Sequence, residues 1–294
     1  MKIGLQIPRF TWPSGPEGLA DKLAEIGRTA DDAGFASIWV MDHFFQLEPM
    51  LGKADEPMLE GYGALSFLAA VTKRVRLGTL VSGVVYRQPA FLVKQATNLD
   101  VLSGGRAYYG IGAGWYEREA RGLGFPFPPL AERFEWLEET LQITHQMWSG
   151  DVKPFKGQHF RLAEGICSPL PLSKPHPPIM IGGMGETKTL RMVAQYGDAC
   201  NLFAGDNYDV LLHKLEVLRG HCERLGRPYE EIERTTLGTV HLAPGKMSAA
   251  DVIDRCRRLA DVGIQHAIFN MPNVHEITPL ATFAKEIIPA VAEM

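Results

Sequence analysis

The sequence predicts an α/β protein whose parallel strands close into one (β/α)8 TIM barrel, a single domain spanning residues 1–294. Two observations support this prediction. Short apolar runs alternate with amphipathic segments along the whole chain and make about eight strand–helix units, the number that closes a barrel. Each predicted strand is too apolar to have a face in solvent, which is typical of parallel sheets buried on both faces. An open doubly wound sheet is the alternative, but the chain carries no strand-order signal for it.

Each unit is an apolar run followed by apolar residues at helical spacing. Gly34 suits the left-handed conformation that ends a helix, and Pro89 suits a first helical turn, where its missing N–H has no partner to lose. The predicted strands are Ile3–Ile7, Ser37–Met41, Val75–Val81, Ala107–Ile111, Ile179–Ile181, Ala199–Phe203, Thr235–Leu242 and His266–Asn270. The predicted helices are Gly18–Ala33, Gly63–Thr72, Pro89–Leu102, Ala131–Trp148, Lys188–Tyr196, Val210–Arg224, Ala249–Ala260 and Leu280–Val291.

Two insertions interrupt the repeat, at about residues 115–130 after the fourth strand and 150–178 before the fifth. The first contains the glycine- and proline-rich run GLGFPFPP, and the second is rich in proline and contains a hairpin-like piece, Phe155–Leu162. Loops this long in a compact domain usually cover a site or reach an interface. Proline also restricts the unfolded chain, so a purely structural role is the alternative.

Composition excludes several classes of function. The chain has 30 Lys and Arg against 34 Asp and Glu, a net charge of −4, so we expect no nucleic-acid partner. No stretch approaches the ~20 apolar residues of a membrane span, and the start of the chain does not resemble a signal peptide. The four cysteines form no Cys-x-x-Cys pair, and the hydrolase motifs that hold metals are missing. We expect a cytoplasmic protein that acts on a small molecule without a metal.

Candidate chemistry lies where a barrel carries it, at the carboxyl ends of the strands. Asp42 and His43 follow the second strand and place an acid beside an imidazole, a combination suited to proton transfer near neutral pH. The alternative is an aspartate that caps the next turn beside a partly exposed histidine. Gly182 and Gly183 precede a helix, which predicts an anion site on backbone N–H groups, or else a tight strand–helix connection.

Four segments, taken in order, resemble the bacterial-luciferase-like superfamily of (β/α)8 enzymes, in its deazaflavin-dependent oxidoreductase branch. They are SIWVMDHF, RVRLGTLVSGVVYRQPAFLVKQATNLDVLSGGR, YYGIGAGWYEREARGLGFPFPPLAERFEWLEE and PPIMIGGMGETKTLRMVAQYGDACNLF. The resemblance covers nearly the whole chain. It implies that coenzyme F420, an 8-hydroxy-5-deazaflavin, binds at the carboxyl end of the barrel and carries hydride at its C5 atom. Flavin mononucleotide (FMN) is the alternative cofactor.

The resemblance also implies roles for particular residues. His43 would exchange a proton with substrate, and Asp42 would fix its imidazole or contact the cofactor ring. A bulge behind the ring would contain a non-prolyl cis peptide at Leu80–Val81. The implied cofactor-binding residues are Asp42, His43, Thr79, Leu80, Val81, Gly112, Ala113, Gly114, Gly182, Gly183 and Met184.

The substrate is not identified by the resemblance. Sugar-phosphate dehydrogenases of this branch carry a carboxylate directly after the fourth strand's glycine turn, where this chain has Trp115. Trp12, Phe44 and Trp115 instead favour an apolar or planar substrate. Two functions compete with the F420-dependent oxidoreductase: an FMN-dependent monooxygenase on the same fold, and a non-catalytic deazaflavin-binding protein. A homodimer is expected from the family likeness.

Overall fold

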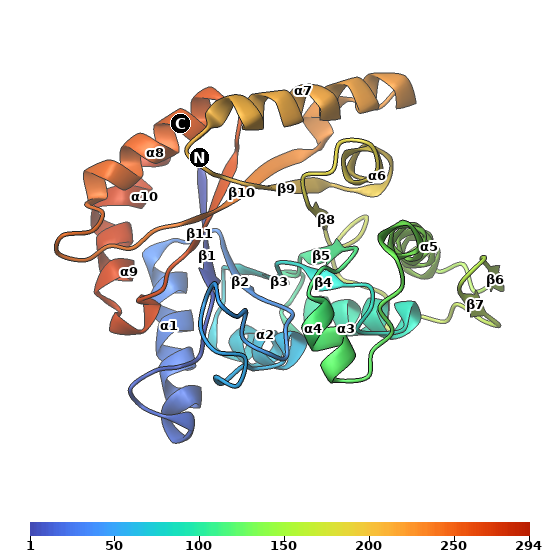
Figure 1. Cartoon of the computed structure of the whole chain (residues 1–294), viewed down its shortest axis with the longest axis horizontal. Helices are drawn as coiled ribbons and strands as arrows, with labels where there is room; N and C mark the ends of the chain where they lie inside the picture. The colour runs from blue at the N-terminus through green and yellow to red at the C-terminus, as the bar shows by residue number, and fades with distance from the viewer.

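The computed structural model describes all residues, Met1–Met294, and shows a parallel sheet curled into a barrel with helices around it (Figure 1). The neighbouring strands follow the order β3-β2-β1-β11-β10-β9-β8-β5-β4. The predicted fold class is confirmed. The strands are β1 (Lys2–Ile7), β2 (Ser37–Val40), β3 (Arg76–Thr79), β4 (Ser82–Gly83), β5 (Tyr109–Gly112), β8 (Ile179–Gly182), β9 (Ala199–Phe203), β10 (Glu233–Thr239) and β11 (His266–Asn270).

The barrel closes between its third and fourth strand positions. The N–H of Leu77 in β3 donates to the carbonyl of Arg106 at 2.9 Å, and the N–H of Tyr108 donates to the carbonyl of Leu77 at 2.8 Å. The strand predicted over Val75–Val81 is present as β3 and ends at Thr79; after the interruption at Leu80–Val81, β4 follows just beyond the predicted end. That peptide bond is cis, as the family resemblance implied.

The predicted helices are present, with ends shifted by a few residues. α2 starts before the predicted Gly63, because the Glu60 carboxylate accepts hydrogen bonds from the N–H groups of Tyr62 at 3.2 Å and Gly63 at 2.6 Å. The last predicted helix is divided by a π-helical turn, Phe283–Ile287. The helices are α1 (Leu19–Ala33), α2 (Gly61–Val71), α3 (Pro89–Leu102), α4 (Glu117–Gly122), α5 (Leu130–Trp148), α6 (Thr189–Tyr196), α7 (Tyr208–Leu225), α8 (Ala249–Asp261), α9 (Thr278–Thr282) and α10 (Ile288–Val291).

The two insertions have defined structure. The second contains the expected hairpin, with antiparallel β6 (Phe155–Lys156) and β7 (Arg161–Leu162) at the periphery of the molecule (Figure 1). The first contains α4, which we did not predict. Its six residues make less than two turns, too few for helical periodicity to be visible in the sequence.

The two ends of the barrel differ. At the amino ends of the strands, the Glu233 carboxylate accepts hydrogen bonds from Lys2 Nζ at 2.8 Å and from the Tyr108 hydroxyl at 2.6 Å. His266 Nδ1 lies 3.6 Å from the same carboxylate. Buried apolar side chains, among them Trp39 and Met180, fill the space next to this network. The carboxyl ends of the strands therefore remain as the open end of the barrel. No helix of this protein combines the length and apolar character that a membrane crossing requires.

Candidate active site

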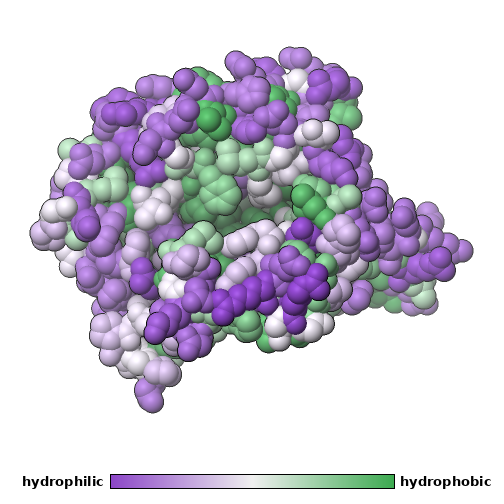
Figure 2. Space-filling model, in the orientation of Figure 1, coloured by the Kyte–Doolittle hydropathy of each residue, from purple (hydrophilic) through white to green (hydrophobic).

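A cavity of about 320 Å³ opens at the carboxyl ends of the strands, and the space-filling view shows a hollow with hydrophobic residues inside it (Figure 2). Its lining comes from the segments that follow β2, β3, β5 and β8 and from β9 and β10. Sequence segments far apart in the chain therefore meet here, as the barrel prediction requires. The predicted site residues that line the cavity are His43, Leu80, Val81, Gly112, Ala113, Gly114, Trp115, Gly182 and Gly183.

Five predicted site residues do not line this cavity. Asp42 and Thr79 are buried beneath it, and Met184 lies beside the glycine turn. Phe44 stacks on Phe125 with ring centroids 5.5 Å apart. Trp12 packs in the core against Phe10, 5.6 Å away, so the substrate contact expected of Trp12 is not present in this structure. Aromatic residue type alone does not distinguish a core residue from a cavity wall.

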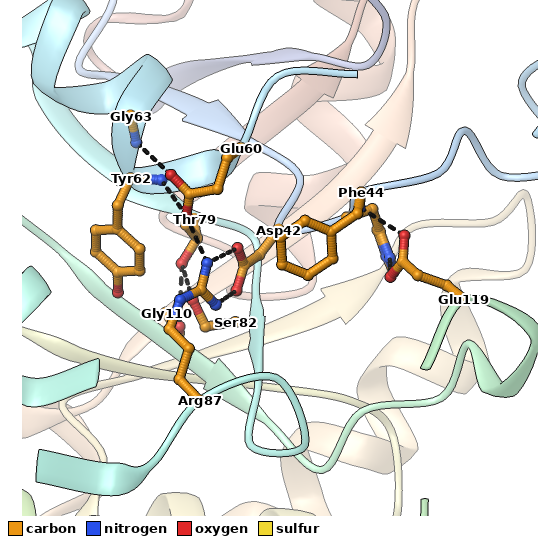
Figure 3. Close-up of polar contacts among 11 residues, drawn as sticks. Asp42, Phe44, Glu60, Tyr62, Gly63, Thr79, Ser82, Arg87, Gly110 and Glu119 are labelled. Atoms are coloured by element: carbon orange, nitrogen blue, oxygen red, sulfur yellow. Dashed lines mark hydrogen bonds and ion pairs between the residues drawn. The ribbon is translucent and has the colours of Figure 1, made fainter. Parts of the chain in front are cut away.

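His43 is held by a carboxylate that the sequence analysis did not identify. Its Nδ1 lies 2.9 Å from Oε1 of Glu119, on α4. Oε2 of the same carboxylate accepts the backbone N–H groups of Phe44 at 2.5 Å and Phe45 at 2.6 Å (Figure 3). Glu119 therefore fixes both the imidazole and the segment of chain that carries it.

The Glu119 carboxylate is ionised at neutral pH. Burial of the side chain, which has no exposed surface, raises its pKa. The hydrogen bond and charge of His43 and the N–H of Phe45 outweigh burial, so the pKa lies below its ordinary value. A carboxylate only accepts hydrogen bonds, so Nδ1 of His43 carries the hydrogen and its other ring nitrogen, Nε2, is left without a carboxylate partner.

Asp42 has a different role from the predicted one. Its carboxylate is 1% exposed and pairs with Arg87 through two contacts, Nη1 to Oδ2 at 2.6 Å and Nη2 to Oδ1 at 2.8 Å. Arg87 Nη2 also donates to Glu60 Oε1 at 2.5 Å (Figure 3). Asp42 therefore does not hold the imidazole, because the guanidinium occupies both of its oxygens; the alternative expectation, contact with the cofactor ring, stays a prediction. Asp42 and Arg87 tie the end of β2 to the turn before α3 and to the start of α2.

The floor of the cavity is flat because glycines surround the side chain of Val81. An added Cβ at Gly112 would lie 2.9 Å from a methyl carbon of Val81, and one at Gly182 would lie 3.0 Å from it. Beneath this floor the Thr79 hydroxyl hydrogen-bonds Ser82 at 2.9 Å and the Gly110 carbonyl at 3.2 Å. The bulge at Leu80–Val81 is thus supported from below, and no larger side chain fits beside it.

Backbone N–H groups without protein acceptors lie slightly further along the chain than the predicted Gly182–Gly183 anion site. The N–H of Gly183 donates to the Asn201 carbonyl at 3.2 Å, so it is engaged within the protein. The backbone N–H groups from Met184 to Thr189 donate no hydrogen bond to protein acceptors, and they lead into the start of α6. Thr189 also lines the cavity. This row of free N–H groups at a helix N-terminus is suited to a phosphate.

The chain is similar to known proteins in both sequence and fold. Residues 1–285 match the family described as luciferase-like monooxygenase. An F420-dependent glucose-6-phosphate dehydrogenase of Kineococcus radiotolerans is 32% identical over 220 residues, which are 73% of this chain but only 62% of that enzyme. The enzyme of the same name from Microbacterium testaceum is 24% identical over 334 positions, covering 96% of each chain. The fold is similar to that of an F420-dependent secondary alcohol dehydrogenase solved with an F420–acetone adduct, with a TM-score of 0.82, 20% identity and coverage of 99% of this chain and 98% of that one.

Proposed function

This chain belongs to the luciferase-like monooxygenase family, and on that basis we propose that it is an F420-dependent oxidoreductase of a small organic substrate. One observation carries the proposal: a proton-transfer group and a phosphate-binding segment face the same cavity. His43, Gly182 and Thr189 all line this cavity. The names of the relatives favour the deazaflavin cofactor over FMN.

The cavity fits a planar tricyclic ring with a phosphate-bearing side chain. Leu80 and Val81 line the floor, and Val81 packs so closely on Gly112 and Gly182 that neither position accommodates a Cβ. The free N–H groups from Met184 to Thr189 would bind the phosphate of the side chain. When bound, the deazaflavin supplies a two-electron carrier of hydride.

The residues of the chain then perform three tasks. The floor residues orient the ring, and the aromatic walls exclude water from the substrate side. His43 holds or accepts a proton at Nε2, next to the position of substrate oxygen. Glu119 is a positioning residue, because its carboxylate holds His43 and the backbone of Phe44 and Phe45 and keeps the hydrogen on Nδ1. This arrangement requires one proton at Nε2 for each hydride moved.

A fluorescence titration tests the cofactor assignment. The apo-protein is titrated with F420 and, separately, with FMN, and quenching gives the two dissociation constants. We expect F420 to bind at least about tenfold more tightly, a difference of about 1.4 kcal/mol. Tighter FMN binding together with stoichiometric consumption of oxygen by the reconstituted enzyme would overturn the proposal in favour of the FMN-dependent monooxygenase.

Turnover distinguishes the enzyme from a non-catalytic deazaflavin-binding protein. The holoenzyme is expected to interconvert oxidised and reduced F420 in the presence of a substrate, and His43→Ala to lose about 10²- to 10⁴-fold in kcat, the usual contribution of general acid–base catalysis. The affinity of the variant for F420 is measured in the same titration, so that loss of the proton-transfer group is separated from loss of the cofactor. An unchanged kcat in His43→Ala contradicts the assigned role of the imidazole.

A further inference from the structure

We propose that the substrate of this site is an uncharged, predominantly apolar alcohol or its carbonyl product, and that sugar phosphates are rejected. The proposal rests on the proposed function, since it concerns the side of the same cavity that faces His43. It departs from the glucose-6-phosphate activity for which the relatives are named.

The walls around His43 are aromatic and aliphatic. The ring of His43 meets the edge of Trp115 with centroids 5.7 Å apart and the edge of Tyr86 at 6.3 Å. At the mouth of the cavity Trp115 is 55% exposed, Leu130 53% and Phe203 62%. Large apolar side chains gathered at a concave surface favour a ligand that covers apolar area.

None of the 17 residues that line the cavity is Lys, Arg, Asp or Glu. His43 and Tyr86 are its titratable groups. Burial raises the pKa of the Tyr86 phenol and the negative charges of Glu119 and Asp42 raise it further, so Tyr86 stays neutral. A phosphate dianion placed against this wall would lose its water without gaining a counter-charge, which is strongly unfavourable.

Two cations lie next to the cavity, and neither is among the residues that line it. Arg133 Nη1 donates to the Gly114 carbonyl at 2.5 Å, and its guanidinium stacks 4.0 Å from the Phe127 ring. Lys188 lies against the Phe134 ring at 5.5 Å, inside the segment whose free N–H groups would hold the cofactor phosphate. A second phosphate, on the substrate, therefore has no binding group left to it.

The polar atoms on the wall around His43 are its own Nε2 and the hydroxyl of Tyr86, which has no hydrogen-bond partner in the protein, and together they match a single hydroxyl or carbonyl oxygen. In the oxidative direction the substrate O–H proton would pass to Nε2, and F420, when bound, would accept the carbon-bound hydrogen with its electron pair. A C=O bond forms, so the alcohol is oxidised by two electrons and the deazaflavin is reduced by two. The reverse direction returns the proton from the imidazolium to the oxygen.

A substrate panel with the F420 holoenzyme tests the proposal. Reduction of F420 is followed with cyclohexanol and 1-phenylethanol against glucose 6-phosphate and glucose, and oxidation of reduced F420 is followed with cyclohexanone. We expect kcat/KM for the apolar compounds to exceed that for glucose 6-phosphate by about 100-fold or more, the usual consequence of an uncompensated buried charge. Preferred turnover of glucose 6-phosphate, or of none of the apolar compounds in either direction, overturns the proposal.

The panel separates this proposal from the proposed function. Failure of F420 to bind in the titration refutes the proposed function itself, whereas F420 binding with turnover of glucose 6-phosphate refutes only the substrate class.

A matched pair of variants adds a direct test of wall charge. Leu130→Arg places a cation at the cavity mouth, and Leu225→Arg places one at the end of α7 on a leucine of similar exposure, 48% against 53%.

Leu130→Arg is expected to shift the ratio of kcat/KM for glucose 6-phosphate over cyclohexanol upward by about tenfold or more, because a charge-assisted contact to phosphate becomes available. Leu225→Arg should leave that ratio unchanged. An unchanged ratio in Leu130→Arg, with F420 affinity intact, contradicts the view that missing positive charge excludes the phosphate.

Discussion

Replacing Glu119 with Gln is expected to reverse the tautomer of His43. The wild-type carboxylate accepts three N–H groups: His43 Nδ1 at 2.9 Å and the backbone of Phe44 and Phe45 at 2.5 and 2.6 Å. A glutamine amide has one acceptor oxygen and one donor nitrogen. If its oxygen keeps the two backbone contacts, its NH₂ group faces Nδ1, which must then act as an acceptor. The hydrogen moves to Nε2, and the cavity loses its proton acceptor.

The opposite orientation of the amide is less favourable. Its NH₂ group would face the N–H groups of Phe44 and Phe45 and leave both donors buried without a partner, at a cost of about 1–3 kcal/mol each. The first orientation therefore prevails. Since general-base catalysis contributes about 10²- to 10⁴-fold, kcat of Glu119→Gln should fall within that range while F420 affinity is retained.

The assay reads the tautomer directly and needs no substrate. Protein with ¹⁵N-labelled histidine is studied by NMR, and the His43 ring signals are identified by their loss in His43→Gln. We expect the Nδ1–H form in the wild type and the Nε2–H form in Glu119→Gln. Glu117→Gln is the matched control, two residues away on α4, 54% exposed and paired with Arg121 at 2.6 Å. The same tautomer in wild type and Glu119→Gln, or kcat within about twofold of wild type, refutes the reasoning.

Three further predictions concern stability and cofactor binding. Arg87→Met leaves Asp42 buried without its partner and should lower the free energy of unfolding in urea by about 3–5 kcal/mol. Arg118→Met, which breaks an exposed pair with Glu48, should cost under about 1 kcal/mol, and equal losses would contradict the importance assigned to burial. Gly183→Ala and Gly226→Ala both place a side chain at positive φ, 128° at Gly183 and 67° at Gly226. Only Gly183→Ala should lower the affinity for F420 in the fluorescence titration, because Gly226 lies at the end of α7. Burial raises the pKa of Glu233, but the hydrogen bond and charge of His266 and contacts with Lys2 and Tyr108 lower it more, so its folded pKa lies below the ordinary 4.5. The ionised Glu233 carboxylate stabilises the fold fully above its ordinary pKa of 4.5, and this stabilisation is lost as the pH falls toward the lower folded pKa. Between about pH 5 and pH 3 the free energy of unfolding should therefore decline less in Glu233→Gln than in the wild type.

The parts of the site that follow directly from strand ends could be predicted from the sequence. His43 and the glycines near Gly182 come straight after apolar runs, and a barrel brings such positions to one end. The bulge at Leu80–Val81 was implied only by the family resemblance. The amphipathic helices were visible for the same reason, since each buries one face against the sheet.

The partners of these residues were not visible, because they depend on tertiary packing. Glu119 lies on a helix too short to show a period, inside an insertion rich in glycine and proline. Arg87 stands in a turn 45 residues beyond Asp42, and no local pattern reveals that pairing. The free N–H groups begin at Met184, not Gly183, because the Asn201 carbonyl, whose position depends on how β9 pairs with β8, engages the Gly183 amide. These contacts exist only once the strands are in register.

The contact between His43 and Glu119 joins residues 76 positions apart, one at the end of a strand and the other on α4. Short surface segments with few buried neighbours open before the core does. A low denaturant concentration that unfolds α4 should therefore inactivate the enzyme, while circular dichroism still shows an intact barrel. The enzymatic rate then reports whether α4 is packed against His43. The difference between the denaturant concentration that inactivates the enzyme and the one that unfolds the barrel measures the local stability of α4.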